Sequence, residues 1–340
     1  MVNKKILFLG ILSIVVLFVS ITIGSSNIPI SDIMNVIMHQ LFNTPLSESI
    51  TESLIVIIMT IRLPRVLLAF VVGSALAMSG CLVQSVLKNP LATPYTLGVS
   101  SGAGLGVGLA IVFGMSLPLL QGYDLVIVGF IGGVLTVLSV ILFASKTDRD
   151  LSGTSVVLMG MILSLFLNAI LNVVSYFAYD KMQAIALWQL GTFSLRGWSY
   201  LQLYIPFFIL GTLAICFFMK ELDIMSFGDE TARSLGVSVA KVKRRILIIA
   251  ALLSGSSVAI CGIIGFIDLV APHLARKLVG NKHSLLLPTS FFIGGMLMVI
   301  ADTLARTIVS PSELPVGAVI ALVGAPLFAK IYFERMKSFG

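Results

Sequence analysis

Long apolar runs separated by short polar or charged breaks make up most of this chain. A helix of about 20 apolar residues spans a bilayer core about 30 Å thick. Lipid cannot satisfy backbone polar groups, so runs of this length are expected to be helices. The pattern predicts an all-α, polytopic membrane protein in which residues 1–340 form a single transmembrane domain. The ten predicted spans are 5–24, 62–84, 94–113, 123–145, 153–176, 200–219, 245–264, 267–279, 285–305 and 314–333.

Three segments depart from this simple pattern. The eighth run is short and contains Pro272 and His273, which predicts a half-helix or a broken helix shielded by protein or by a water-filled cavity. Apolar residues recur at helical spacing over 30–41 with polar residues between them, as in an amphipathic helix at a membrane surface. Segment 177–199 holds both tryptophans of the chain, which is typical of a membrane–water boundary.

Composition excludes a soluble domain. Of the 340 residues 58% are hydrophobic and only 11% are charged, and the mean hydropathy is +1.08. Soluble domains carry about 25% charged residues. The net charge of +7 does not indicate a nucleic-acid partner, because the basic residues lie at the ends of apolar runs and form no stripe with interleaved aromatics. The three cysteines, Cys81, Cys216 and Cys261, are scattered in apolar segments without a CxxC pair, so neither a zinc site nor a disulfide is expected. No cofactor or other metal site is predicted.

The lysines and arginines predict the orientation in the membrane. If the N-terminus is cytoplasmic, 17 of the 22 basic residues fall on the cytoplasmic side. The opposite orientation reverses this ratio and violates the positive-inside rule. We therefore expect ten spans with both termini in the cytoplasm. The five basic residues then expected outside are Arg62, Arg65, Lys181, Arg196 and Arg306.

Two motifs resemble those of enzymes but fit membrane packing better. Gly98 to Gly102 matches G-x-S-x-G, a hydrolase motif with Ser100 as nucleophile, yet that motif needs a preceding strand and here it opens an apolar helix. Glycines at 102, 104, 106 and 108 instead allow close approach of membrane helices. A phosphate-binding G-x-x-x-x-G-K-[ST] loop is absent from the sequence, so the chain is not expected to hydrolyse ATP itself.

The charged residues within apolar runs allow two interpretations. Asp302 and Arg306 are one helical turn apart and close enough to pair, whereas Asp268 and His273 belong to the short eighth run. Such groups are costly in a membrane and usually face a cavity or one another. A structural ion pair is one interpretation. A proton relay through Asp268, His273 and Asp302, as in a proton-coupled secondary transporter, is the other.

Segment 221–244 is the one sizeable loop expected in the cytoplasm. Asp229 and Glu230 suit the start of a short helix, and Gly236 suits its end. Ser238 can cap a second helix that continues into the seventh span. Two short helices held by two spans would form a projection that a soluble partner can grip, although a solvated connector has the same pattern.

Several motifs, taken together, resemble the FecCD family, the permeases of type II ABC importers for ferric siderophores, haem and cobalamin. The resemblance covers the chain from about residue 55 to its C-terminus, with the motifs in the family's order and spacing. The motifs are Arg62-Leu-Pro-Arg65, Gly80-x3-Gln84, Asn89-Pro-Leu-Ala-x-Pro94 with Leu97-Gly98, 228–237 (GDETARSLGV), Gly262-x2-Gly265-Phe266 with Pro272-His273-x2-Arg276, Ala301-Asp302-x3-Arg306, Glu313-Leu-Pro-x-Gly317 and Gly324-Ala-Pro326.

This resemblance implies functional residues and partners. It implies a permease dimer of two copies or two paralogues in a bacterial cytoplasmic membrane, ABC ATPase subunits, and an extracellular or periplasmic substrate-binding protein. The implied cargo is an iron chelate, with a ferric siderophore favoured over haem and cobalamin. Arg62, Arg65 and Arg306 resemble the arginines that receive the binding protein. The segment that resembles the ATPase-coupling helices comprises Gly228, Asp229, Glu230, Thr231, Ala232, Arg233, Leu235, Gly236 and Val237.

The resemblance also implies a gate. Asn89 and Leu91 match a cytoplasmic gate, and Gly153, Thr154 and Ser155 resemble a second constriction. Spacing alone adds Asn168 and Asn172, one turn apart on the fifth span, as residues that line the pathway. At Asp268 the family usually has glycine, so the packing of the eighth span is expected to differ there.

Overall fold

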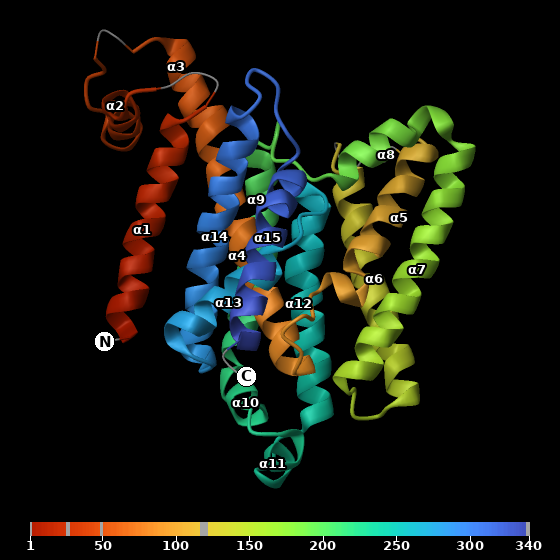
Figure 1. The fold of residues 1–340 in the computed structure, drawn as a ribbon. Coiled ribbons are helices and arrows are strands. Elements are labelled where there is room, and N and C mark those ends of the chain that lie inside the picture. Colours follow the sequence, from red (N-terminus) through yellow and green to blue (C-terminus); the bar gives the residue numbers. More distant parts are fainter. Residues whose placement is uncertain (1, 25–27, 48–49, 116–121, 338–340) are drawn as a thin grey trace.

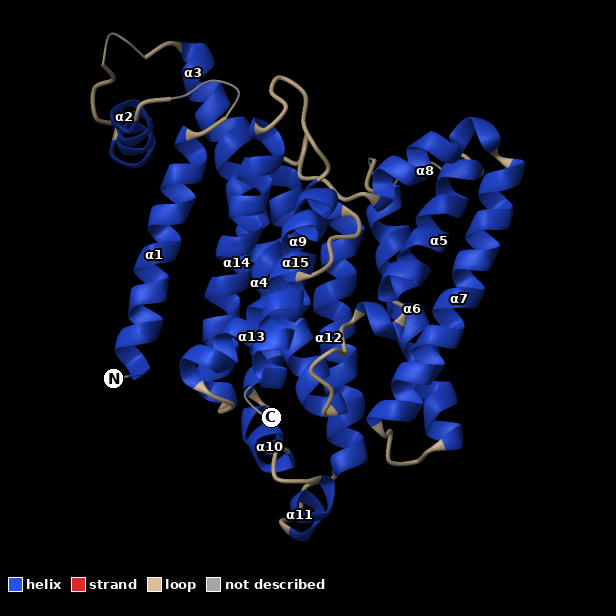
Figure 2. Ribbon diagram, in the orientation of Figure 1, coloured by secondary structure: helices blue, strands red, loops and turns tan. Residues whose placement is uncertain are grey.

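The computed structural model describes residues 2–24, 28–47, 50–115 and 122–337, and these contain helices but no strands (Figure 2). A central group of helices is flanked by α1 on one side and by α5–α8 on the other (Figure 1). The elements are α1 (Val2–Thr22), α2 (Ile30–Phe42), α3 (Glu52–Val56), a π-helical segment (Ile57–Arg62), α4 (Leu63–Leu87), a 3-10 turn (Tyr95–Leu97), α5 (Val99–Val112), α6 (Asp124–Thr147), α7 (Gly153–Phe177), a 3-10 turn (Tyr179–Lys181), α8 (Met182–Gln189), α9 (Trp198–Cys216), α10 (Met219–Met225), α11 (Asp229–Ser234), α12 (Val239–Cys261), α13 (Ile267–Val279), α14 (His283–Thr307) and α15 (Val316–Lys337).

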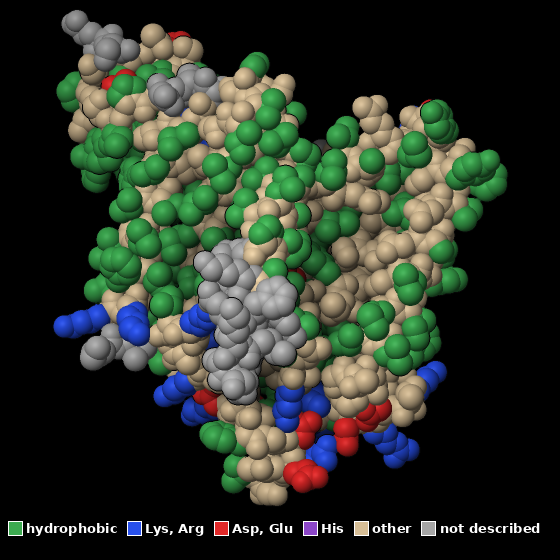
Figure 3. Space-filling view, in the orientation of Figure 1, with side chains coloured by type: hydrophobic (Ala, Val, Ile, Leu, Met, Phe, Trp, Pro, Cys, Tyr) green, Lys and Arg blue, Asp and Glu red, His purple; other side chains and the backbone are tan. Residues whose placement is uncertain are grey.

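The all-α membrane fold predicted from the apolar runs is confirmed. Seven helices in the described part are long and apolar enough to cross a bilayer, and α5 and the first part of α15 are shorter apolar helices. Together with α13 they correspond one to one to the ten predicted spans. Apolar side chains cover the middle of the molecule, and charged side chains gather at the end that carries α11 (Figure 3). We call this end the α11 end and the opposite one, with α2 and α8, the α2 end.

Some predicted boundaries were wrong. The second span was expected to begin at 62, but one continuous helix begins at Glu52 and passes through the π-helical segment before α4. The third span was expected from 94, but α5 begins only at Val99. A 3-10 turn precedes it, and Gly98 adopts a φ of +85° that a residue with a side chain seldom tolerates.

The eighth span is a half-helix rather than a broken one. Helix α13 has 13 residues and continues through Pro272, so at 1.5 Å per residue it covers about 20 Å, well short of a bilayer core. Before it, Phe266 has a left-handed backbone with φ +68°. The extended segment 262–265 that leads to it is enclosed by protein, since Tyr95 donates a hydrogen bond to the Ile264 carbonyl at 2.7 Å.

Close helix packing through glycine builds the core around α4. A Cβ on Gly73 would lie 2.4 Å from the Gly294 carbonyl oxygen, so α4 and α14 touch backbone to backbone. Likewise a Cβ on Gly102 would lie 2.4 Å from the Gly132 carbonyl oxygen, which joins α5 to α6. The glycines of the third span therefore serve helix packing, as predicted. Since a 3-10 turn and no strand precedes Ser100, the hydrolase motif lacks its structural context.

Candidate functional site

The projection expected between the sixth and seventh spans is present at the α11 end (Figure 1). Helix α11 begins at Asp229, directly after Gly228 with φ +123°. Gly236, with φ +84°, ends it, because its N–H bonds to the Arg233 carbonyl and the next N–H bonds to the Ala232 carbonyl. The expected capping bond of Ser238 is absent: this residue precedes α12 without a side-chain hydrogen bond to it.

Two large apolar side chains are exposed on this projection. Leu235 is 64% exposed and Phe227 is 78% exposed, although both lie in the charged end of the molecule. Leu235 was among the predicted coupling residues, but Phe227 was missed because it precedes the helix and breaks the amphipathic pattern. Apolar side chains among charges are typical of a protein-binding surface.

The two predicted gate segments lie next to each other. Asn89 and Leu91 follow the end of α4, where the Asn89 carboxamide oxygen accepts a 2.9 Å hydrogen bond from the Leu91 N–H. Gly153 begins α7, and a Cβ there would lie 2.2 Å from the Leu87 carbonyl oxygen. The start of α7 thus rests directly on the end of α4. Thr154 is exposed, and Ser155 donates its N–H to Ser152, the N-cap of α7.

Sequence reasoning missed the residue that holds the second of the predicted gate segments. The Asp148 carboxylate accepts hydrogen bonds at 3.0 Å from the N–H groups of Asp150 and Ser152, and one at 3.3 Å from the Ser155 hydroxyl. The bonds from Ser152 and its neighbours lower the pKa of Asp148 to about 2. An Asp four residues before a helix N-cap is the available sequence signal for such a turn.

Asn168 and Asn172 both lie on an exposed face of α7, one turn apart as predicted. Their neighbours Leu165 and Phe166 are 71% and 61% exposed. Two amides on an otherwise apolar exposed helix face at membrane depth are expected to meet a cavity or another protein surface.

At the α2 end the three predicted docking arginines lie together but are largely buried. Arg62, Arg65 and Arg306 are 5–6% exposed. Arg62 donates to the Ile21 and Thr22 carbonyls at 2.7 and 3.1 Å. Arg306 donates to the Ser20 hydroxyl at 2.7 Å. These bonds hold the ends of α1, α4 and α14 together.

Asp302 is the centre of this arginine cluster. The expected pair with Arg306 is present at 3.8 Å, but the stronger partner is Arg65, whose Nε and Nη2 atoms reach the Asp302 carboxylate at 2.9–3.1 Å. Arg65 also donates to Glu313 at 2.8 Å. Asp302 is 1% exposed and Glu313 is 34% exposed, so one guanidinium joins a buried and a half-exposed carboxylate. Spacing within one helix cannot reveal such partners, which come from other elements.

The other two residues of the suggested proton relay lie apart from this cluster. Asp268 is 1% exposed at the crossing of α13 with α4, where its main-chain oxygen accepts a hydrogen bond from Gln84 and blocks any Cβ at Gly80. It forms no ion pair with any residue that the structure describes. His273 lines a pocket nearer the α11 end. Asp302 is engaged by two arginines, which favours the ion-pair interpretation.

Comparison with known proteins identifies the family of this chain. The model of the FecCD transport family matches residues 11–334. The chain belongs to the FecCD transport family. It is 42% identical to YvrB, an uncharacterized ABC transporter permease protein of Bacillus subtilis, covering 94% of this chain and 90% of that one. It is 40% identical to HmuU, a hemin transport system permease protein of Yersinia pestis, covering 95% and 94%.

A solved structure agrees with this membership. The inward-facing conformation of a metal-chelate type ABC transporter matches with a TM-score of 0.84 and 31% identity, covering 98% of this chain and 99% of that one. The predicted type II ABC importer permease fold is thereby confirmed. As a FecCD member the chain is a transport protein, and neither the hydrolase nor the proton-driven interpretation is needed.

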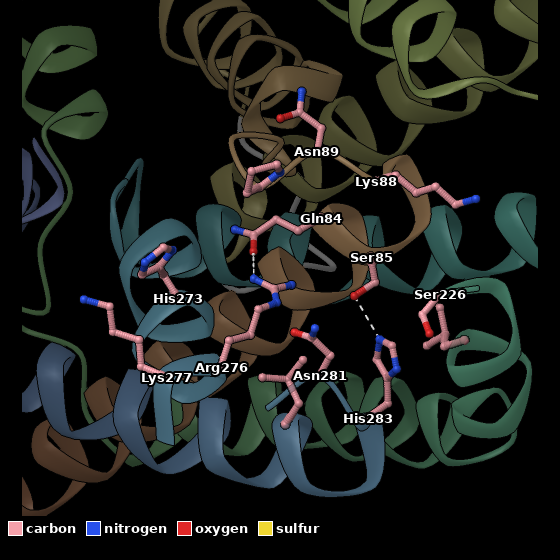
Figure 4. A pocket seen from close by; sticks show the side chains of 13 residues that line it. Gln84, Ser85, Lys88, Asn89, Ser226, His273, Arg276, Lys277, Asn281 and His283 are labelled. Carbon is pink, nitrogen blue, oxygen red and sulfur yellow. Dashed lines mark hydrogen bonds between the residues drawn. The ribbon is translucent and has the colours of Figure 1, made fainter. Parts of the chain in front are cut away.

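The FecCD chain also has a pocket of about 680 Å³ at its α11 end (Figure 4). Its walls come from α4, α10, α13 and α14. Two hydrogen bonds brace them: Arg276 donates to the Gln84 carboxamide oxygen, and the His283 ring bonds to the Ser85 hydroxyl at 2.8 Å. Asn89 lines the same pocket, so the first gate segment borders it.

Proposed function

We propose that this chain is the membrane-spanning permease subunit of an ATP-driven importer that carries an iron chelate across a bacterial cytoplasmic membrane, with both termini inside. In this proposal the α11 end faces the cytoplasm and the α2 end faces outward. The match to the FecCD family over residues 11–334 carries the proposal. The concentration of basic residues at the α11 end supports the orientation (Figure 3).

ABC ATPase subunits are the proposed partners at α11. The exposed Leu235 and Phe227 supply apolar contact area, and Glu230 and Arg233 supply charges around it. A site of this kind, with an apolar centre and a polar rim, is typical of protein interfaces. The permease itself carries out no chemistry: ATP hydrolysis by the partner would move α11 and change which side of the pathway is open.

A substrate-binding protein is the proposed partner at the arginine cluster. Arg62, Arg65 and Arg306 are 5–6% exposed, and Arg65 pairs with the half-exposed Glu313 at 2.8 Å. Carboxylates of the binding protein would bind at this cluster, where charge complementarity sets register and association rate. Association should therefore slow as salt is raised.

A second copy or a paralogue is the proposed partner at α7. Its exposed face, with Asn168 and Asn172, would border the pathway shared by the two permeases. The favoured cargo is a ferric siderophore. Haem is the second candidate, because HmuU, which is 40% identical, is named for hemin transport.

The first test is recovery of partners. The tagged chain in nanodiscs, drawn from iron-starved cells, should bring down an ATPase subunit, and Leu235→Asp should abolish this. Leu195→Asp is the matched control, since Leu195 is equally apolar and 95% exposed but lies at the α2 end. Recovery of the chain without any ATPase subunit would refute the proposal. Uptake of ⁵⁵Fe-loaded siderophore against ⁵⁵Fe-haem by the reconstituted complex then decides the cargo.

A further inference from the structure

Asp229, the first residue of α11, points into the molecule rather than toward a partner. Its Oδ2 atom accepts a 2.7 Å hydrogen bond from the Lys243 ammonium, and Lys88 lies 2.6 Å from its Oδ1 atom. Lys88 and Asp229 thus form an ion pair, in addition to the hydrogen-bonded pair with Lys243. One carboxylate therefore joins the start of α11 to two other helices, α12 and α4.

Lys243 carries the connection further, to the loop before α7. Its side chain is 3% exposed, and its ammonium group also donates to the carbonyl oxygens of Asp150 and Leu151, each at 3.3 Å. A buried ammonium needs both a counter-charge and acceptors for its three protons, and Lys243 has all of them here. Arg233, in the last turn of α11, adds a second link to the same loop through a 2.8 Å ion pair with Asp150.

Both connections end directly beside a gate segment. Lys88 is the residue before Asn89, and it ends α4 with a left-handed φ of +52°. Leu151 is fully buried with φ +51°, two residues before Gly153. A non-glycine residue keeps a positive φ only through its surroundings, so the backbones of Lys88 and Leu151 depend on the contacts made here. Movement of Asp229 would thus pass to both segments at once.

The balance of charges shows why this network of ion pairs depends on Asp229. Three cations, Lys88, Arg233 and Lys243, are balanced by two carboxylates, Asp229 and Asp150. Among the carboxylates that the structure describes, only Asp229 contacts both lysines. Without it Lys243 stays buried with carbonyl partners alone, and a buried charge that loses its counter-ion is strongly unfavourable.

We infer that Asp229 is a positioning residue that ties the coupling helix to both gate segments, so that one displacement of α11 moves Asn89–Leu91 and Gly153–Ser155 together. This inference rests on the proposed function, since it assigns a transmission role within an ATP-driven permease. It differs from a contact with the ATPase, which the exposed side chains of α11 supply.

The test is the ratio of ATP hydrolysed to chelate transported by the reconstituted complex. Asp229→Asn, which keeps the shape and removes the charge, should still recover the ATPase subunit, and the ratio should rise at least tenfold. Asp229→Glu, which restores the charge, should recover most of the coupling. Asp180→Asn is the matched control, because Asp180 is 75% exposed at the α2 end. Uptake and hydrolysis that fall in proportion, or a ratio that stays unchanged, would overturn the inference.

A second measurement needs no partner and keeps the inference separate from the proposed function. Hydrogen exchange of the isolated chain in nanodiscs should accelerate in both 88–92 and 148–155 on Asp229→Asn, whereas α8 should be unaffected. Faster exchange confined to 229–235, or no change, would show that Asp229 does not hold the gate segments. Failure of wild-type protein to recover an ATPase subunit would refute the proposed function while leaving this result standing.

Discussion

The arginine cluster offers a sharp test of whether Asp302 is structural. Asp302→Asn keeps the shape of the side chain but removes the charge that Arg65 reaches through three contacts of 2.9–3.1 Å. Both side chains are buried, and removing one partner of a buried pair costs about 3–5 kcal/mol. Since asparagine keeps one acceptor oxygen, we expect the lower end, about 3 kcal/mol. At about 1.4 kcal/mol per tenfold change, the unfolding constant should rise by about two orders of magnitude.

The same arginine supplies the control. Glu313→Gln removes the other carboxylate of Arg65, but Glu313 is 34% exposed, and exposed ion pairs contribute at most about 1 kcal/mol. Both variants should be measured by equilibrium unfolding of the purified chain in mixed micelles, alongside chelate uptake. If Asp302→Asn unfolds no more readily than Glu313→Gln, the ion pair does not hold the helices. Uptake lost at unchanged stability would instead revive a proton relay.

Three further predictions concern the rest of the chain. Gly153→Ala should separate α7 from α4, because the added Cβ would lie 2.2 Å from the Leu87 carbonyl oxygen. A pair of cysteines introduced at the end of α4 and the start of α7 should cross-link at least tenfold more slowly in this variant than in the parent. Ser100→Ala should leave uptake within twofold of the parent, and its loss would restore the hydrolase interpretation. Asp148 has its pKa lowered to about 2 by hydrogen bonds from Ser152 and its neighbours. The protection from hydrogen exchange that Asp148 gives the α6–α7 loop should persist well below pH 4 and disappear only as the pH falls through about 2, the pKa of Asp148. In Asp148→Asn, hydrogen exchange of the loop should be fast at every pH.

How much of this molecule the sequence predicts depends on the range of the interactions involved. The apolar runs predict the membrane helices because a bilayer imposes a length on each helix separately. Gly236 predicts the end of α11 because a left-handed residue at that position is a local requirement. The π-helical segment Ile57–Arg62 has no comparable signal, so the start of the second span was misplaced by about ten residues.

Contacts between distant segments were not predictable from one sequence. Asp302 and Arg65 are 237 positions apart, and Lys243 is 92 positions from Leu151, so no periodicity relates them. Motif resemblance predicted functional roles for Asp229 and Arg65 but did not say what their side chains contact. The arginines expected at an open rim are instead buried among carbonyls and carboxylates, which only the packing of α1, α4 and α14 determines.

Helix α4 carries Arg65 near one end and Lys88 at the other, about 35 Å apart at 1.5 Å per residue. It is the most enclosed long helix in the described part of the chain, and glycines lock it backbone to backbone against α14. In the proposed importer, such a helix would form a rigid frame that connects the binding-protein docking surface at one end to the ATPase contact at the other. The peripheral helices α5–α7 touch α4 where Gly153 meets Leu87, and α6 packs on α12 where Gly129 meets Ala259, so a movement of these helices would have to change both contacts.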